Sequence, residues 1–174
     1  TESAGGAIIN RDRMWHYTEG ITNFAPIWSA HGIRILPGPS SLWIDATGKR
    51  LPVPLFPGFD TLGTLAHLRT TGHDYSWFVL TQKIIEREFA LSGSEQNPDL
   101  TGKSILKVLG RRFGLQGPVD AFKKQGVDFI VKQTLPELVA AMNERAGSAL
   151  IDADALERVI VARDREIENT YTKD

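Results

Sequence analysis

The sequence predicts an α+β domain in which a small, mixed or antiparallel sheet from the first half of the chain is covered by about five helices. Three observations favour this class. Six of the nine prolines lie between Pro26 and Pro57, and all four tryptophans lie before residue 78. Proline fixes φ and lacks a backbone donor, so short strands and ordered loops are expected there. Later in the chain, apolar residues recur at helical spacing. A length of 174 residues fits a single domain.

The strand candidates come mainly from the first half of the chain. Gly32–Leu36 and Ser41–Asp45 are rich in β-branched and aromatic residues. Asp45–Gly48 predicts a turn, because an Asp side chain can cap its own backbone and Gly accepts a positive φ. Lys49–Leu51 would return as the partner strand, kept short by the prolines after it. Tyr75–Leu80 is expected to be a short aromatic strand.

Four stretches have apolar residues at helical spacing or typical helix-end residues. They are Asp60–Thr71, Gln82–Leu91, Ser104–Phe113 and Val119–Gln125. Phe129–Val131 is expected to be a further short strand.

The clearest local signal opens the helix that follows. Thr134 and Glu137 have the spacing of a capping box. The helix is expected to bury Leu138 and Met142 and to end near Gly147.

The last helix is expected to begin at Asp152 or Asp154. Its predicted apolar side consists of Leu156, Val159, Ile160 and Ile167. Its predicted solvated face consists of Arg158, Arg163, Asp164, Arg165 and Glu166.

Composition excludes several functional classes. The 20 basic and 21 acidic side chains give a net charge of −1, so the basic footprint of a nucleic-acid-binding protein is missing. The absence of cysteine excludes a disulfide scaffold, a cysteine nucleophile and thiolate metal sites. No apolar run approaches the roughly 20 residues of a membrane span. We expect a protein that binds neither nucleic acid nor metal, with a cytoplasmic location, which the absence of cysteine fits.

Common cofactor and nucleophile motifs are also missing. No two glycines are separated by a single residue, as in Gly-x-Gly, so the chain cannot supply the phosphate-binding turn of a Rossmann domain. Thr101–Ser104 is similar to the end of a P-loop, but Asn97 stands where that loop requires a glycine. The hydrolase pattern Gly-x-Ser-x-Gly does not occur either.

The remaining candidates lie within Arg11–Ser41. Tyr17 and His16 can exchange protons with a substrate, and Arg34 can hold an oxyanion or carboxylate. We expect the substrate site to be lined by three further residues, Trp15, Ser40 and Ser41. The alternative is structural, because Trp, Tyr and His often lie half-buried in a core with their polar atoms satisfied.

Several long segments resemble the bacterial FAD-binding dehydrogenases, flavoproteins of the fumarate reductase/succinate dehydrogenase superfamily that are related to 3-ketosteroid Δ1-dehydrogenases. The segments are Arg11–Gly32, Arg34–Ser41, Leu55–Thr61, Asp74–Thr81 and Glu86–Asp99. Two further features are similar to the broader superfamily. Leu42–Leu51 resembles its strand, turn and Gly-x-Arg-aromatic element, and Phe129–Leu138 with the final helix resembles the end of its cap domain.

The resemblance implies that this chain is the substrate-covering cap domain of a larger flavoprotein, inert by itself. The partner would be the FAD-binding domain of the same polypeptide, and no FAD is expected to bind tightly to the cap alone. The start at Thr1 and the polar C-terminus fit such an internal piece. The parent enzyme would abstract a proton and pass a hydride to FAD, acting on a CH–CH pair of a ketosteroid-like or dicarboxylate-like small molecule.

The sequence departs from the fumarate reductases at two places. Pro37–Ser41 replaces their Arg-Gly-x-Gly loop, and no Arg occurs between Arg50 and Arg69, where they carry an acid Arg. Arg34 and Tyr17 are the nearest groups that could replace it. A rival hypothesis is a free-standing ligand-binding or interaction domain with no redox role.

Overall fold

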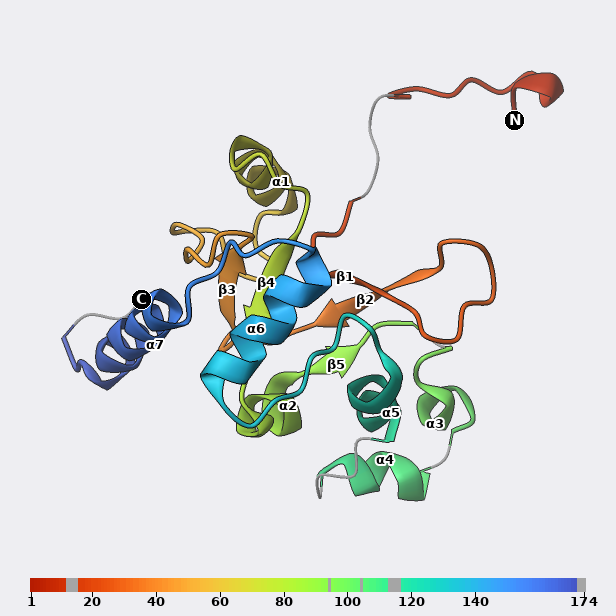
Figure 1. Ribbon diagram of the computed structural model, residues 1–174. Helices are drawn as coiled ribbons and strands as arrows, with labels where there is room; N and C mark the ends of the chain where they lie inside the picture. The colour runs from red at the N-terminus through yellow and green to blue at the C-terminus, as the bar shows by residue number, and fades with distance from the viewer. Residues whose placement is uncertain (12–15, 94, 104, 113–116, 172–174) are drawn as a thin grey trace.

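The structure is a computed structural model that describes residues 1–174 except 12–15, 94, 104, 113–116 and 172–174 (Figure 1). It confirms the α+β class. Within the described ranges, five helices have at least eight residues, and every strand pair is antiparallel.

The strands form two small sheets. The first has the order β1-β2-β5, with β1 at Gly20–Thr22, β2 at Gly32–Leu36 and β5 at Ala90–Leu91. The second pairs β3, Leu42–Asp45, with β4, Ser76–Val79. The predicted strands β2 and β3 are therefore confirmed, and the aromatic strand β4 is confirmed with slightly shorter bounds.

The turn after β3 forms as expected. The Asp45 Oδ1 atom accepts from the Thr47 backbone N–H at 2.8 Å, and Gly48 has φ of +84°. The partner strand predicted at Lys49–Leu51 is reduced to an isolated β-bridge between Ile44 and Arg50.

The predicted helices occur in the predicted order. The helix bounds are α1 Thr61–Thr70, α2 Gln82–Glu88, α3 Pro98–Thr101, α4 Ile105–Arg112, α5 Gly117–Gln125, α6 Leu135–Ala146 and α7 Ala153–Glu168, after a short 3₁₀ turn at Glu2–Ala4. The short helix α3 and the 3₁₀ turn near the N-terminus occur in addition to the predicted helices. Asp60 caps α1 by accepting from the Gly63 N–H at 2.8 Å. Residues 104 and 113, at the ends of the predicted helix Ser104–Phe113, lie outside the described residues. None of the described helices is both long and apolar enough to cross a membrane.

Two expected elements are wrong in extent or type. The helix predicted over Gln82–Leu91 ends at Glu88, because Leu91 pairs with Ile35 to form β5. The strand expected at Phe129–Val131 does not form. Instead, the Phe129 N–H donates to the Gly126 carbonyl at 3.1 Å and so closes a turn. The Phe129 ring packs against the Phe89 ring.

The capping box of α6 is confirmed. The Thr134 hydroxyl accepts from the Glu137 N–H at 3.4 Å, and the Glu137 carboxylate accepts from the Thr134 N–H at 3.2 Å. The helix buries Val139 and Met142, whereas Leu138 is only half-buried. It ends at Gly147, as predicted.

The last helix differs from its prediction on both faces. Asp152 caps it and Leu156 is buried, but Ile167 is 51% exposed. Arg163, expected in solvent, is only 16% exposed and donates to the Ser40 carbonyl at 2.6 Å. The helix therefore attaches to the loop after β2 through a residue expected to be solvated.

Two apolar clusters hold these elements together. One joins β2 and β5 to α2 and α5, and the other joins β3 to α6 and α7. In Figure 1, α6 lies in front of the sheets and α7 lies to one side. The largest fully buried side chains are Phe122, Ile44, Leu156 and Thr64.

Candidate functional site

A cavity of about 740 Å³ is lined by residues of β1, β2 and β4, of helices α1, α2 and α6, and of the segment 128–132. Its wall is largely aromatic and aliphatic. The aromatic lining consists of Tyr17, Tyr75, Trp77, Phe78, Phe89 and Phe129. Cavities of roughly 300–1,000 Å³ with few polar groups are typical of small-molecule sites. The described wall also contains six charged residues, Glu19, Asp74, Lys123, Asp128, Lys132 and Arg145, so the cavity suits a ligand that has both apolar and polar parts.

Three polar residues form a cluster at this cavity, which we call the Tyr17 cluster: Tyr17, Glu19 and Arg34. Tyr17 and Glu19 line the cavity, whereas Arg34 is absent from its described lining and lies next to these two residues. The Arg34 guanidinium carbon lies 4.2 Å from the centre of the Tyr17 ring, a cation–π contact. Its Nε lies 3.7 Å from the Glu19 Oε2 atom.

Strand pairing explains why these residues meet. Gly20 on β1 is directly opposite Arg34 on β2, so the residues that precede β1 lie beside the Arg34 side chain. The Ile35 N–H donates to the Glu19 carbonyl at 2.8 Å and extends this pairing by one residue. The positions of Tyr17 and Glu19 relative to Arg34 therefore follow from the register of the β1–β2 hairpin.

Glu19 was not singled out by sequence reasoning. Its side chain is 3% exposed, and its Oε1 atom accepts from the Gly58 N–H at 3.1 Å. Neither Glu19 Oε2 nor Arg34 Nε makes a hydrogen bond. Glu19 and Arg34 therefore form an ion pair in which these two atoms are not hydrogen-bonded to each other. A lone Glu before a strand carries no sequence signal of burial, because Glu is usually exposed.

The other predicted site residues are placed differently. His16 precedes Tyr17 and is exposed. Trp15 lies outside the described residues. Ser40 and Ser41 are absent from the described lining of the cavity. The roles assigned to all these residues remain predictions.

Ser40 is held by a carboxylate and a guanidinium. Its hydroxyl and N–H donate to the two Glu88 oxygens at 2.7 Å and 2.9 Å, while its carbonyl accepts from Arg163. These Ser40 hydrogen bonds lower the pKa of Glu88, with a smaller contribution from the Arg163 charge. The Ser41 hydroxyl donates to the Gly38 carbonyl at 2.8 Å. Both serines are thus engaged in shaping their own loop.

Asp128 joins two elements of the cavity wall. Its Oδ2 atom accepts from the Thr22 N–H at 2.8 Å, and its Oδ1 atom accepts from Arg145 at 2.7 Å and 2.9 Å. Burial alone would raise the pKa of Asp128, but the hydrogen bonds from Thr22 and Arg145 outweigh it and lower that pKa. This carboxylate fixes α6 relative to β1.

His31 has a structural role. It is 6% exposed, its Nδ1 lies 3.2 Å from both the Ile27 nitrogen and the Asn23 amide nitrogen, and its ring stacks on Trp28. For this histidine the structural interpretation therefore holds.

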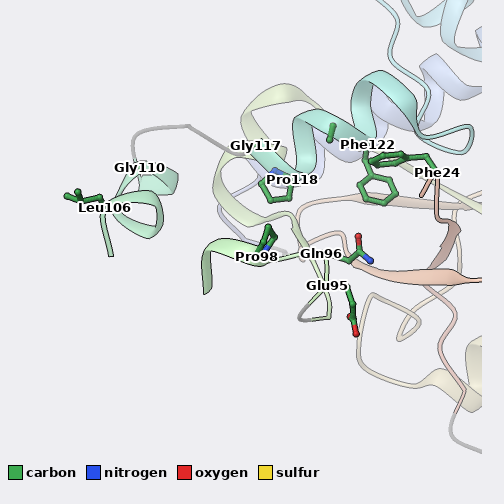
Figure 2. A pocket seen from close by; sticks show the side chains of 10 residues that line it. Phe24, Glu95, Gln96, Pro98, Leu106, Gly110, Gly117, Pro118 and Phe122 are labelled. Atoms are coloured by element: carbon green, nitrogen blue, oxygen red, sulfur yellow. The ribbon is translucent and has the colours of Figure 1, made fainter. Parts of the chain in front are cut away.

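A second cavity of about 680 Å³ lies between α3, α4 and α5 (Figure 2). Phe24 and Phe122 meet edge to face at 4.6 Å on one side of it. Figure 2 shows Leu106 on α4 standing apart from these rings, and its side chain is 83% exposed. Glu95 is the only ionisable group in the described lining. The described lining brings together no acid–base pair or positive charge suited to catalysis.

Comparison with known proteins defines the class to which the chain belongs. The sequence model of a family described as "FAD binding domain" matches residues 1–174, so the chain belongs to this FAD-binding family. The predicted flavoprotein membership is thereby confirmed.

Its relatives are more specific. The chain is 62% identical to KsdD-like steroid dehydrogenases from two strains of Mycobacterium tuberculosis, CDC 1551 / Oshkosh and H37Rv, and 57% identical to one from Mycolicibacterium smegmatis. In each case 99% of this chain is covered, but only 31–32% of the relative. The chain thus spans about a third of the length of these curated relatives. No solved structure matches it.

The described residues do not fit the dinucleotide part of FAD. Such cofactors bind at the carboxyl ends of parallel strands, where a glycine-rich turn leads into a helix. All strand pairs in the described part of the chain are antiparallel, and the sequence has no Gly-x-Gly pair. We therefore derive no chemical step through the flavin from these residues.

Proposed function

We propose that this chain forms the substrate-covering part of an FAD-dependent steroid dehydrogenase that acts on a CH–CH pair. The observation that carries the proposal is the cavity of about 740 Å³ with an aromatic wall and a polar Tyr17 cluster. A fused-ring hydrocarbon that carries oxygen atoms has apolar surface for the aromatic wall and polar groups for the charged residues of the lining. The names of the mycobacterial relatives support a steroid as the substrate class.

The Tyr17 cluster supplies the groups that such a reaction needs from the protein. The Tyr17 hydroxyl is the candidate proton-transfer group, since its ring lines the cavity. Arg34, held over that ring and beside Glu19, would orient a substrate oxygen. His16 is the alternative proton-transfer residue. The apolar wall would exclude water from the bound substrate.

Turnover by the full-length flavoprotein tests the role of Tyr17. In steady-state assays with a steroid substrate and an artificial electron acceptor, Tyr17→Phe should lower kcat by about 10²–10⁴-fold, the usual contribution of a proton-transfer group. The flavin content should not change. Tyr171→Phe is the matched control, because Tyr171 is 94% exposed. It should retain normal turnover.

Two results would redirect the proposal. Unchanged turnover in Tyr17→Phe together with a large loss in His16→Gln would assign proton transfer to His16. Unchanged turnover in both variants would remove this cluster from proton transfer. Absence of steroid oxidation by a flavin-loaded wild type would contradict the proposed reaction itself and favour a ligand-binding or interaction domain with no redox role.

A further inference from the structure

We propose that the buried carboxylate of Glu19 determines substrate specificity by making the Tyr17 cluster accept a neutral oxygen, carbonyl or hydroxyl, in preference to a carboxylate. The inference rests on the proposed function, because it needs the Tyr17 cluster to face the substrate. It assigns a role to a side chain that the proposed reaction does not otherwise use.

Arg34 by itself would favour an anion. A guanidinium presents donors in a planar fork that matches a carboxylate, so an uncompensated Arg next to the wall residues Tyr17 and Glu19 would attract a carboxylate ligand. Here the Glu19 Oε2 atom lies 3.7 Å from Arg34 Nε. The pair has no net charge, so Arg34 can still donate hydrogen bonds but exerts much less attraction on a distant anion.

Glu19 also repels an anion directly. A carboxylate bound to Arg34 would lie roughly 7 Å from the Glu19 carboxylate, and at the effective dielectric constant of a protein site this repulsion is worth about tenfold or more in affinity. Solvent screens the interaction poorly, because the Glu19 side chain is only 3% exposed. A neutral carbonyl or hydroxyl meets no such repulsion.

The carboxylate is fixed in place. Its Oε1 atom accepts from the Gly58 N–H at 3.1 Å, and the backbone of Glu19 is bound to Ile35 in the extended β1–β2 pairing. Glu19 therefore cannot turn away from Arg34 without losing a hydrogen bond. The Arg34 side chain is 29% exposed and is bounded by Tyr17 on one side and Glu19 on another.

Three of the other charged residues of the lining, Asp128, Arg145 and Lys123, also have a partner of opposite charge. Asp128 binds Arg145 at 2.7 Å, and Lys123 lies 3.6 Å from Asp120. The described lining has three basic residues, Lys123, Lys132 and Arg145, and three acidic residues, Glu19, Asp74 and Asp128, so it has no excess of positive charge that would attract an acidic ligand.

Equilibrium dialysis of two ligands against the full-length flavoprotein tests the proposal without relying on turnover. The probes are a steroid ketone and a steroid with the same ring skeleton that carries a carboxylate in place of the ketone. The measured quantity is the ratio of their dissociation constants, carboxylate over ketone.

Glu19→Gln keeps the side-chain size and an oxygen for the Gly58 N–H but removes the charge. Glu166→Gln is the control, since Glu166 on α7 is an exposed glutamate that pairs with Arg50.

The wild type should bind the ketone more tightly, and the ratio should fall about tenfold or more in Glu19→Gln while staying unchanged in Glu166→Gln. The double variant Glu19→Gln/Arg34→Gln removes both charges and should bring the ratio back toward the wild-type value, which shows that charge and not shape is responsible. Equal ratios in Glu19→Gln and wild type, or tighter carboxylate binding by the wild type, would overturn the role of Glu19. If the wild type binds neither steroid, the proposed function fails, and this inference fails with it.

Discussion

Gly38 is the position where one added methyl group should be most informative. It precedes the predicted site residues Ser40 and Ser41, and its φ of +82° lies in the left-handed region. A Cβ atom there would lie 2.5 Å from the Glu88 Cβ and 2.9 Å from its Oε2. The Cβ of Glu88 is fixed to the backbone and cannot move aside as the end of a flexible side chain could. Gly38→Ala therefore combines backbone strain with steric overlap.

The cost of Gly38→Ala can be divided into two parts. The left-handed conformation costs an Ala about 1–2 kcal/mol. Overlap in a packed site adds about 1–3 kcal/mol. Gly72→Ala isolates the first part, because Gly72 has a similar φ of +77° and its Cβ would meet no atom within 4 Å. The difference between the two variants should therefore be about 1–3 kcal/mol.

Urea unfolding of both variants measures this difference as the change in the free energy of unfolding. We expect Gly38→Ala to be clearly the less stable of the two. Equal destabilisation would show that the loop after β2 does not approach Glu88 as closely as the structure has it. The reasoning about the contacts of Ser40 would then be wrong.

Three further changes test separate parts of the fold. Glu88→Gln should destabilise the protein near neutral pH. The pKa of Glu88 is lowered by folding, so the ionised carboxylate stabilises the protein fully above the ordinary pKa of 4.5. This stabilisation disappears as the pH falls through the lowered pKa. The unfolding curves of variant and wild type should therefore converge in acid. Asp128→Ala should lower the free energy of unfolding by about 1–3 kcal/mol, because it leaves the Thr22 N–H and Arg145 without their acceptor, as urea titration would show. Thr134→Ala should cost about 1 kcal/mol through the lost cap of α6, and an unchanged thermal midpoint would contradict that.

Elements determined by neighbouring residues could be predicted from the sequence. The capping box of α6, strand β2 and the turn at Asp45–Gly48 each depend on side chains within a few positions of one another. Their hydrogen bonds form locally, so the residue pattern already contains the partners. The cap at Asp152 and the end of α6 at Gly147 are further examples.

Elements that depend on distant partners could not be predicted in the same way. Ala90–Leu91 leaves the helical pattern because β2 provides a strand to pair with. Arg163 turns inward because the Ser40 carbonyl, 123 positions away in the chain, accepts from it. In both cases tertiary contacts outweigh local periodicity.

The candidate site shows the same division. Residue chemistry pointed to Tyr17 and Arg34, and the β1–β2 pairing brings them together. The burial of Glu19 depends on the distant Gly58 loop and had no counterpart in the sequence pattern. The loop position of Ser40 and Ser41 suggests a substrate contact, but their hydroxyls donate to the Glu88 carboxylate and the Gly38 carbonyl.

Flavin titration tests the central claim, that this chain provides the substrate side of a flavoenzyme whose FAD is held elsewhere in the polypeptide. The purified chain and the full-length protein would each be titrated with FAD and followed by flavin fluorescence and calorimetry. We predict no binding to the chain at tens of micromolar, and stoichiometric yellow flavin in the full-length protein. Tight FAD binding by the chain alone would place the cofactor site within these residues and contradict the account.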